Sequence, residues 1–378
     1  MSEVQARSRL VPSSRVDELF SAAEAEAMAA ALDAAALGVR GANPLVGAVI
    51  LDAAGHRLAV GYHRGAGTPH AEADAIAQLP AGITDLSGAT ILVTLEPCNH
   101  YGRTGPCSEA IIAAGIGRAI YAVDDPHGAA AGGGARLRQA GLDVRSGLLA
   151  EAATELNRRW LLAVKQARPF ITLHIAQTLD ARIAAADGTS QWITSPESLA
   201  DNHATRSRID AILVGTETVL VDNPRLTARN QDGSSSGHQP LRVVMGLRDV
   251  PAEAAVRRSP TDGGDCGFLH LRTRDPLLAA AQLHHRGVRH LMVEGGSRVA
   301  GAFLKAGLVD ELILYLAPTL LGAGVPALGD LGIGTLSQAQ HWIWDSSGGG
   351  AAVALGKDLR LHLTPAAEAA IDENAGGN

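Results

Sequence analysis

The residues of this chain best suited to chemistry lie between His70 and Cys107. One segment contains His70 and Glu72, and two Pro-Cys pairs follow, which end at Cys98 and at Cys107. Zinc prefers imidazole and thiolate ligands, and a catalytic zinc site keeps its fourth position open for water. The one His and two Cys supply three ligands of this kind. The pattern therefore predicts a zinc site with room for a water molecule.

Glu72 stands two residues after His70 and is not needed as a ligand, so its carboxylate is available to move protons. Zinc that activates water beside a Glu acting as general acid and base is the arrangement of zinc-dependent deaminases. A single Cys is more often a small buried hydrophobic residue. Packing alone, however, rarely places two Pro-Cys pairs and a His-x-Glu segment in this order. We therefore expect deaminase chemistry, with Glu72 as the catalytic residue.

Two helix starts and one strand are expected to position these ligands. Thr68-Pro69 is typical of an N-cap followed by Pro in the first helical position, so the His-Ala-Glu segment would open a helix. The apolar run at 89–95 predicts a buried strand that ends just before Cys98. The second Pro-Cys pair predicts another helix, at 107–114, which Gly115 would end.

A loop of eight residues, 99–106, separates the two Cys, whereas two residues separate them in the usual deaminase signature. The loop reads Asn-His-Tyr-Gly-Arg-Thr-Gly-Pro, and Asn-Pro-Leu-Val-Gly occurs earlier, at 43–47. With the His-Ala-Glu segment, these stretches resemble the family of bifunctional riboflavin-biosynthesis deaminase–reductases. The resemblance runs from about residue 15 to about residue 365.

For the first half, this resemblance implies a cytidine-deaminase-like, three-layer α/β fold. It also implies hydrolytic deamination of 2,5-diamino-6-(ribosylamino)-4(3H)-pyrimidinone 5′-phosphate at a Zn²⁺ site. The implied substrate-binding residues are Asn43, His100, Arg103 and His127. The residues alone leave Asn43 undecided, because Asn-Pro is also an ordinary turn start. At 125–128 the chain has Asp-Pro-His-Gly in place of the family's Asp-Pro-Asn-Pro.

Apolar runs and turn residues predict the other elements of the first half. A helix is expected at 16–39, and strands are expected at 44–52, 57–62, 118–123 and 142–147. Strands that alternate with helices favour a mostly parallel sheet. A connecting helix is expected at 151–166, ending before an Arg-Pro pair.

The second half has strand-length apolar runs at 170–175, 210–215, 241–245, 289–294 and 311–317. A helix is expected from Ser195-Pro196 to about residue 208, with Thr194 and Glu197 spaced as a capping box. The chain has no complete Gly-x-Gly-x-x-Gly, which argues against a Rossmann dinucleotide site. Gly295-Gly296-Ser297 stands between a strand and a helix at 298–306 and could bind a phosphate, although these residues by themselves favour a plain strand–helix turn.

Motifs of the second half resemble the reductase half of the same family, which is similar to dihydrofolate reductase and uses NADPH. They are Thr-Leu-Asp-x-Arg at 178–182, Gly-Thr-Ser-Gln-Trp-Ile-Thr-Ser-Pro at 188–196, Gly-Thr-x-Thr-Val-Leu-x-Asp-x-Pro-x-Leu-Thr at 215–227, and Val-Glu-Gly-Gly at 293–296. The implied cofactor-binding residues are Ala176, Trp192, Thr218, Asp222, Gly296, Ser297, Arg298, Val299, Ala300, Gly301 and Ala302. The implied substrate-binding residues are Ser190, Arg206, Leu226, Arg229, Glu294 and His174. Two of these, Arg206 and Arg229, would clamp the ribose phosphate bidentately.

Some positions of the second half depart from the family pattern. His174 stands where the family has Lys, Ala181 replaces a Gly, and Gly246-Leu247 replaces Asp-Ser. An unperturbed His titrates near about 6.5, so a reductase that needs a charge at His174 would weaken as the pH rises through neutrality. One alternative is therefore a zinc deaminase whose second half only binds a ligand or mediates assembly.

Length and composition point to a two-domain enzyme. The 378 residues favour a deaminase domain at 15–150, a connecting helix at 151–168, a reductase domain at 169–365 and a flexible tail at 366–378. A net charge of −7 argues against a nucleic-acid partner, and thus against the second alternative, a tRNA or nucleic-acid base deaminase. Of three Cys, Cys266 is left over, which fits a reducing cytoplasm. No signal peptide or membrane-spanning run is expected, the partner would be a phosphorylated pyrimidine, and a homo-oligomer is expected.

Overall fold

The computed structural model describes residues 19–65, 67–101, 105–128, 130–258, 267–347 and 349–366. Arg103, Cys266 and the expected tail from residue 367 lie outside the described residues. The chain forms two compact units, one up to Leu161 and one from Leu162 onward, and each is described by itself. In the described part of the chain, no helix has the length and apolar character needed to cross a membrane.

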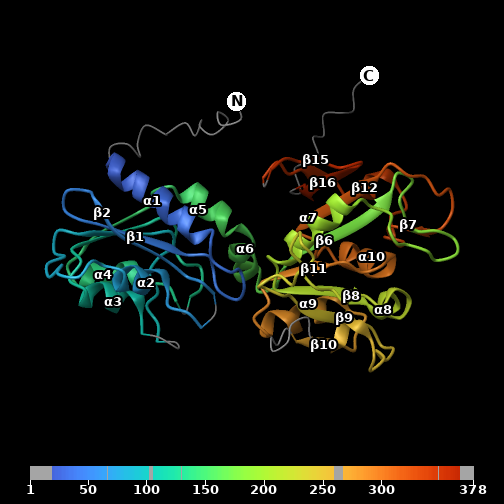
Figure 1. Ribbon diagram of the computed structural model, residues 1–378, viewed down its shortest axis with the longest axis horizontal. Coiled ribbons are helices and arrows are strands. Elements are labelled where there is room, and N and C mark those ends of the chain that lie inside the picture. Colours follow the sequence, from blue (N-terminus) through green and yellow to red (C-terminus); the bar gives the residue numbers. More distant parts are fainter. Residues whose placement is uncertain are drawn as a thin grey trace, which may run out of the picture. The chain divides into compact units, whose positions relative to one another are not determined.

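A five-stranded sheet forms the middle of the first unit (Figure 1). Its strands are β1 (Gly47–Leu51), β2 (Arg57–Tyr62), β3 (Thr90–Val93), β4 (Arg118–Tyr121) and β5 (Asp143–Ser146), in the order β2-β1-β3-β4-β5. β1 runs antiparallel to both of its neighbours, whereas β3, β4 and β5 are parallel. The sheet is therefore mixed, and the expected parallel order applies to its second half.

Helices cover both faces of this sheet. They are α1 (Ala22–Ala35), α2 (Ala71–Ala77), α3 (Cys107–Ala113), α4 (Gly133–Gln139) and α5 (Ala150–Leu156). α1 and α5 pack on the face that carries Val49 and Leu92. The other three pack on the opposite face, which carries Ile50 and Ile91. This alternation of buried side chains along each strand gives the expected three layers.

The start of α1 differs from the expectation. The helix begins after Ser21, whose hydroxyl accepts from the backbone N–H of Glu24, while the Glu24 carboxylate accepts from the backbone N–H of Ser21. This capping box sets the first turn, so the helix begins at Ala22 rather than at residue 16. It ends at Ala35, before the expected residue 39.

The expected connecting helix is broken at Asn157. α5 ends at Leu156, and α6 (Arg158–Gln166) begins after the break. The Asn157 side chain is buried and bonds both polar groups of the Leu45 peptide backbone: Oδ1 accepts from Leu45 N at 2.9 Å and Nδ2 donates to Leu45 O at 2.8 Å. Asn157 thus joins the helix pair to the segment that follows Asn43.

A nine-stranded sheet forms the second unit. Its strands are β6 (Phe170–Thr178), β8 (Ala211–Gly215), β9 (Leu241–Met245), β10 (Phe268–Leu271), β11 (His290–Val293), β12 (Glu311–Ala317), β14 (Trp342–Trp344), β15 (Ala352–Leu355) and β16 (Asp358–Pro365). The order is β10-β9-β8-β11-β6-β12-β16-β14, and β15 also pairs with β16. The strands from β10 to β12 are parallel, and β16 is antiparallel to β12. β7 (Arg182–Ala184) and β13 (Val325–Pro326) form a separate pair.

The helices of the second unit are α7 (Pro196–Arg206), α8 (Thr216–Asp222), α9 (Pro276–His285) and α10 (Ser297–Lys305). α9 and α10 bury Leu283 and Phe303 against Ile171 and Leu291 of the sheet. α7 begins one residue later than the expected capping box. Its N-cap is Ser195, whose hydroxyl accepts from the N–H of Ser198.

Candidate functional site

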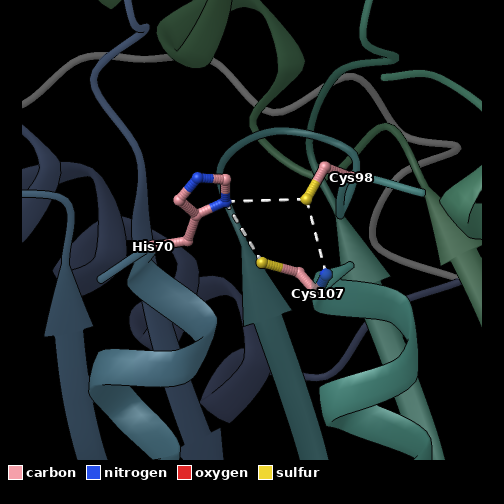
Figure 2. Close-up of side chains that lie close together, drawn as sticks. All are labelled: His70, Cys98 and Cys107. Carbon is pink, nitrogen blue, oxygen red and sulfur yellow. Dashed lines mark hydrogen bonds between the residues drawn. The ribbon is translucent and has the colours of Figure 1, made fainter. Parts of the chain in front are cut away.

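Three candidate zinc ligands meet in the first unit (Figure 2). His70 Nδ1 lies 3.5 Å from Cys98 Sγ and 3.3 Å from Cys107 Sγ, and all the ligand atoms lie within 4.8 Å of one another. Both sulfurs belong to buried residues. One imidazole nitrogen and two sulfurs at this spacing match the donor set and size of a zinc site. The predicted grouping of His70, Cys98 and Cys107 is therefore present.

Each ligand stands at the end of a secondary-structure element or in a loop next to one. His70 is the N-cap of α2, Cys107 is the first residue of α3, and Cys98 lies in the loop after β3. The N-cap expected at Thr68 is wrong, because the Thr68 hydroxyl donates to the carbonyl of Gly65 and the helix starts at Ala71. The backbone N–H of Cys107 donates to Cys98 Sγ at 3.4 Å, which favours a thiolate there.

Glu72 lies in the first turn of α2 and is 3% exposed. Burial raises the pKa of its carboxyl above the ordinary value. A carboxyl group whose pKa is moved toward neutrality can both accept and release a proton at working pH. Its position beside the three ligands thus suits the general acid–base role that the sequence predicts.

His63, which the sequence reading missed, connects Asn43 with the residue before the first ligand. His63 Nδ1 lies 3.0 Å from the carbonyl oxygen of Pro69, so this nitrogen carries the proton and donates. Nε2 then accepts from the Asn43 amide at 3.0 Å. The imidazole is buried and meets the His70 ring edge-on, with 5.5 Å between ring centroids. With its nitrogen engaged, Asn43 has its amide oxygen left for another donor.

The buried carboxylate of Glu96 joins the Cys98 loop to the segment that carries His127. Its two oxygens accept from the N–H groups of Gly134, at 2.9 Å, and Asp125, at 3.3 Å. A Cβ on Gly133 would lie 1.7 Å from the carbonyl oxygen of Pro97, so only Gly allows this approach. His127 is exposed, and the half-buried His100 has no partner for its Nδ1 among the described residues.

A pocket of about 530 Å³ lies in the second unit. Its lining includes the residues that the resemblance implied: His174, Ala176, Ser190, Trp192, Arg206, Thr218, Asp222, Leu226, Arg229, Glu294 and Gly296. Several of them follow the carboxyl ends of parallel strands, the usual place for ligands in such sheets. The other implied cofactor residues, from Ser297 to Ala302, form the first turns of α10 and do not line the pocket.

Arg206 has protein partners that the sequence did not reveal. Its Nε and Nη2 lie 2.9 Å and 2.5 Å from the two carboxylate oxygens of Glu294, and its Nη1 donates to the carbonyl of Thr227 at 3.1 Å. All three nitrogens therefore have protein partners. Arg229 and Arg225, by contrast, line the pocket and form no ion pair or side-chain hydrogen bond within the described residues.

The surroundings shift the pKa values of two titratable groups in this pocket. Burial by itself raises the pKa of Glu294, but the Arg206 guanidinium outweighs it and holds the pKa at about 2. Burial lowers the pKa of His174, and Arg206 lowers it further against the opposing pull of Glu294. The imidazole is therefore neutral at neutral pH.

At two positions that depart from the family pattern, 181 and 246, the backbone has a positive φ. Ala181, where the family has Gly, has a positive φ of 57°, so the backbone keeps a conformation that favours Gly. Gly246 has a φ of 146°, and a Cβ there would lie 2.7 Å from the Thr216 hydroxyl. A larger residue at 246 would thus displace Thr216 from the start of α8.

Two family profiles match the chain. The cytidine and deoxycytidylate deaminase zinc-binding region matches residues 21–123, and the RibD C-terminal domain matches residues 169–347. The first range contains the three ligands and Glu72. The second contains every lining residue of the pocket.

Known proteins are similar over most of the chain. The riboflavin biosynthesis protein RibD of Mycobacterium tuberculosis (strain H37Rv) is 45% identical over 85% of this chain and 91% of its own length. RibD of Escherichia coli (strain K12) is 37% identical over 86% of this chain and 94% of its own length. Among solved structures, Acinetobacter baumannii RibD has a TM-score of 0.79 and 31% identity, covering 91% of this chain and 99% of that one. A Thermotoga maritima diaminohydroxyphosphoribosylaminopyrimidine deaminase/5-amino-6-(5-phosphoribosylamino)uracil reductase has a TM-score of 0.77 and 29% identity, with the same coverage.

Proposed function

Since the chain belongs to the RibD family of riboflavin biosynthesis, whose members join a zinc deaminase to an NADPH-dependent reductase, we propose which of its residues perform each step. The enzyme is bifunctional. It deaminates 2,5-diamino-6-(ribosylamino)-4(3H)-pyrimidinone 5′-phosphate and then reduces the ribosyl group to a ribityl chain. A second half without reductase activity is not favoured, because the similarity to RibD extends through it.

In the deaminase, His70, Cys98 and Cys107 would hold the zinc ion, which supplies an activated water molecule when bound. The Glu72 carboxylate would accept a proton from the attacking water and donate one to the amino group, which leaves as ammonia. The raised pKa of this buried carboxyl supports the exchange, because the group can hold the proton between the two steps.

We propose that Asn43, His100, Arg103 and His127 bind the substrate of the deaminase. The amide oxygen of Asn43 accepts from an N–H group of the pyrimidine, since its nitrogen is bonded to His63. His100 offers a ring nitrogen that has no partner among the described residues, and the bonds of Glu96 keep the His127 segment beside the Cys98 loop. Arg103 lies outside the described residues, and its role rests on the resemblance alone.

In the reductase, NADPH supplies a hydride when bound, and the protein supplies position and charge. We propose that Ala176, Trp192, Thr218, Asp222 and the turn from Gly296 into α10 contact the cofactor. Thr218 Oγ1 lies close to this turn, 3.7 Å from where a Cβ on Gly296 would stand.

The substrate side of the pocket would hold the sugar phosphate. Arg229 and Arg225 supply guanidinium groups that have no ion-pair partner among the described residues, and Ser190 and Leu226 also line the space. Arg206 keeps the Glu294 carboxylate in place, and the N–H groups of its guanidinium that these bonds do not use face the same pocket and can contact the phosphate. His174 contributes a neutral imidazole to the pocket.

We further propose a cytoplasmic homo-oligomer that acts on this small phosphorylated pyrimidine without a nucleic-acid partner. The net charge of −7 supports the last point, because a nucleic-acid site needs a basic surface. An RNA-binding assay and light scattering would check the partner and the assembly.

The grouping of the His70, Cys98 and Cys107 donor atoms beside the buried Glu72 carries the proposal. The test is to supply the diaminopyrimidine phosphate with and without NADPH and to identify the products. Without NADPH, the deaminated ribosyl compound and ammonia should accumulate. With NADPH, the ribityl compound should form and one NADPH should be consumed per product. Reduction in the absence of deamination, or no ammonia at all, would refute the assignment of steps.

A further inference from the structure

The imidazole of His174 has an unsatisfied hydrogen-bonding atom in the pocket of the second unit. His174 lies on β6, is 9% exposed and lines the pocket. Its Nε2 is buried and has no hydrogen-bond partner among the described residues. A buried polar atom without a partner is costly, so a bound ligand is the natural source of one.

Tyr315 packs directly against this imidazole. The two ring centroids are 4.9 Å apart, and the ring planes are inclined by 50°. β12 pairs with β6 so that Ile313 lies opposite His174 and Tyr315 lies opposite Ala176. The two rings are therefore diagonal neighbours on one face of the sheet, a geometry in which aromatic side chains reach each other. Tyr315 is 1% exposed.

Two further residues restrain the Tyr315 ring. Its hydroxyl donates to Asp201 Oδ2 at 2.5 Å, and Asp201 comes from α7. Arg360 of β16 donates to the same carboxylate, at 2.9 Å to Oδ1 and 3.1 Å to Oδ2. Tyr315 cannot turn without breaking the bond to a carboxylate that Arg360 keeps in place.

The charged groups that face His174 are compensated in pairs. Glu294 is paired with Arg206, and Asp201 is paired with Arg360 and bonded to Tyr315. The three charged residues that act on the imidazole, Glu294, Arg206 and Asp201, thus each have an opposite charge beside them, and burial keeps the imidazole neutral. A neutral imidazole nitrogen makes one directional hydrogen bond, and a sugar hydroxyl, which both donates and accepts, can match either tautomer.

We propose that Tyr315 is a positioning residue of the reductase, which holds the His174 imidazole so that Nε2 bonds a hydroxyl of the substrate's sugar. The inference rests on the proposed contact between His174 and the substrate. Tyr315 itself needs no contact with the reacting atoms. Its effect on substrate binding should pass entirely through His174.

A double-mutant cycle tests this dependence. The variants are His174→Ala, Tyr315→Phe, Tyr315→Leu and each Tyr315 change combined with His174→Ala. The Phe variant keeps the volume of the ring and removes only the bond to Asp201. It therefore still tests the inference if the Leu variant does not fold. The readouts are KM for the pre-deaminated substrate, KM for NADPH, and the deamination rate of the same full-length protein.

We expect His174→Ala to raise the substrate KM by about tenfold, the loss of one hydrogen bond. Tyr315→Leu should raise it by about three- to tenfold, and Tyr315→Phe by less. In the His174→Ala background both Tyr315 changes should add less than about twofold, because the ring then has no imidazole to position. KM for NADPH and the deamination rate should stay at parent values.

Three outcomes would overturn the inference. Equal effects of the Tyr315 changes in both backgrounds would mean that Tyr315 acts independently of His174. Unchanged KM in both Tyr315 variants would mean that the ring does not position anything. An unchanged KM in His174→Ala would remove the proposed substrate contact itself, and the positioning role with it, whereas the first two outcomes leave that contact standing.

Discussion

Arg206 of α7 and Glu294, the residue after β11, form a two-point ion pair in the pocket of the second unit, although 88 positions separate them in the sequence. Their side chains are 15% and 10% exposed. The pair explains why a carboxylate is tolerated there, since an unpaired buried charge is strongly unfavourable.

Removing the guanidinium should destabilise the second unit. Arg206→Ala leaves the Glu294 carboxylate buried without its partner, and breaking such a pair costs about 3–5 kcal/mol. Urea unfolding would measure the loss. Arg248→Ala is the matched control, because its pair with Glu217 is mostly exposed and should contribute less than about 1 kcal/mol. Equal losses in the two variants would contradict a special role for the buried pair.

The same pair predicts how stability depends on pH. The pKa of Glu294 is about 2 in the folded protein, below its ordinary value of 4.5, so the folded state holds this carboxylate ionised more strongly than the unfolded state does. The resulting stabilisation is complete above about pH 4.5 and is lost as the pH falls toward about 2. Unfolding free energies measured between pH 7 and pH 3 should fall less steeply for Glu294→Gln than for the parent. Identical slopes would show that Glu294 is not the titrating group.

Variants of a zinc ligand and of Glu72 should differ in their zinc content. Cys107→Ser removes one of three donors, so the purified protein should lose zinc and deamination together. Glu72→Gln should keep about one zinc per chain and lose deamination, because only proton transfer is removed. Elemental analysis and ammonia release measure the two properties. Reduction of pre-deaminated substrate is the internal control and should survive both changes, and a Glu72→Gln variant that deaminates normally would refute its catalytic role.

The pH profile of the reductase should show no loss of a His174 charge near neutrality. From the sequence, reduction was expected to weaken as the pH rises through neutrality if it needs a charge at His174, but burial lowers the pKa of His174 below the ordinary 6.5. The imidazole is therefore already neutral at pH 7. Titration of His174 should therefore not change the initial rates on pre-deaminated substrate between about pH 7 and 8, and His174→Ala should have the same profile shape. If the reduction rate of the parent falls as the pH rises and this fall disappears in His174→Ala, the reductase does use a charged imidazole.

Arg229 is expected to bind the phosphate. It has no partner within the described residues, and loss of one charged contact to a phosphate lowers affinity on the order of 10²-fold. Arg229→Ala should therefore raise the reductase KM for substrate and leave deamination unchanged. Arg272→Ala, which removes an exposed pair with Asp249, is the control for a change of net charge. If both variants raise the reductase KM by the same factor, Arg229 acts only through the net charge of the protein and does not contact the phosphate.

Local patterns predicted the zinc ligands and most central strands. Each ligand stands next to Pro at or near a helix or strand end, so short stretches of sequence were sufficient to group them. The strands β6, β8, β9, β11 and β12 are nearly continuous apolar runs, as buried parallel strands are. β16 was not predicted, because polar residues such as Asp358 and His362 alternate along it and point into a buried network.

Long-range partners could not be predicted. Arg206 was expected to hold a phosphate because its type suits that role, and nothing near it in the sequence shows that its guanidinium also binds Glu294. His63 was not predicted as a site residue for the same reason, because its role follows only from its contacts with Asn43 and Pro69. The helix break at Asn157 depends on Leu45, which is 112 positions away.

That break determines how the two activities could be separated as independent fragments. Asn157 pairs with both polar groups of the Leu45 backbone, as a neighbouring strand would. A deaminase fragment cut at residue 150 would lose this partner and loosen the chain two positions after Asn43. A fragment that retains α5 and Asn157 keeps it. A cut that keeps the first unit intact therefore falls after Asn157, and α5 belongs with the deaminase.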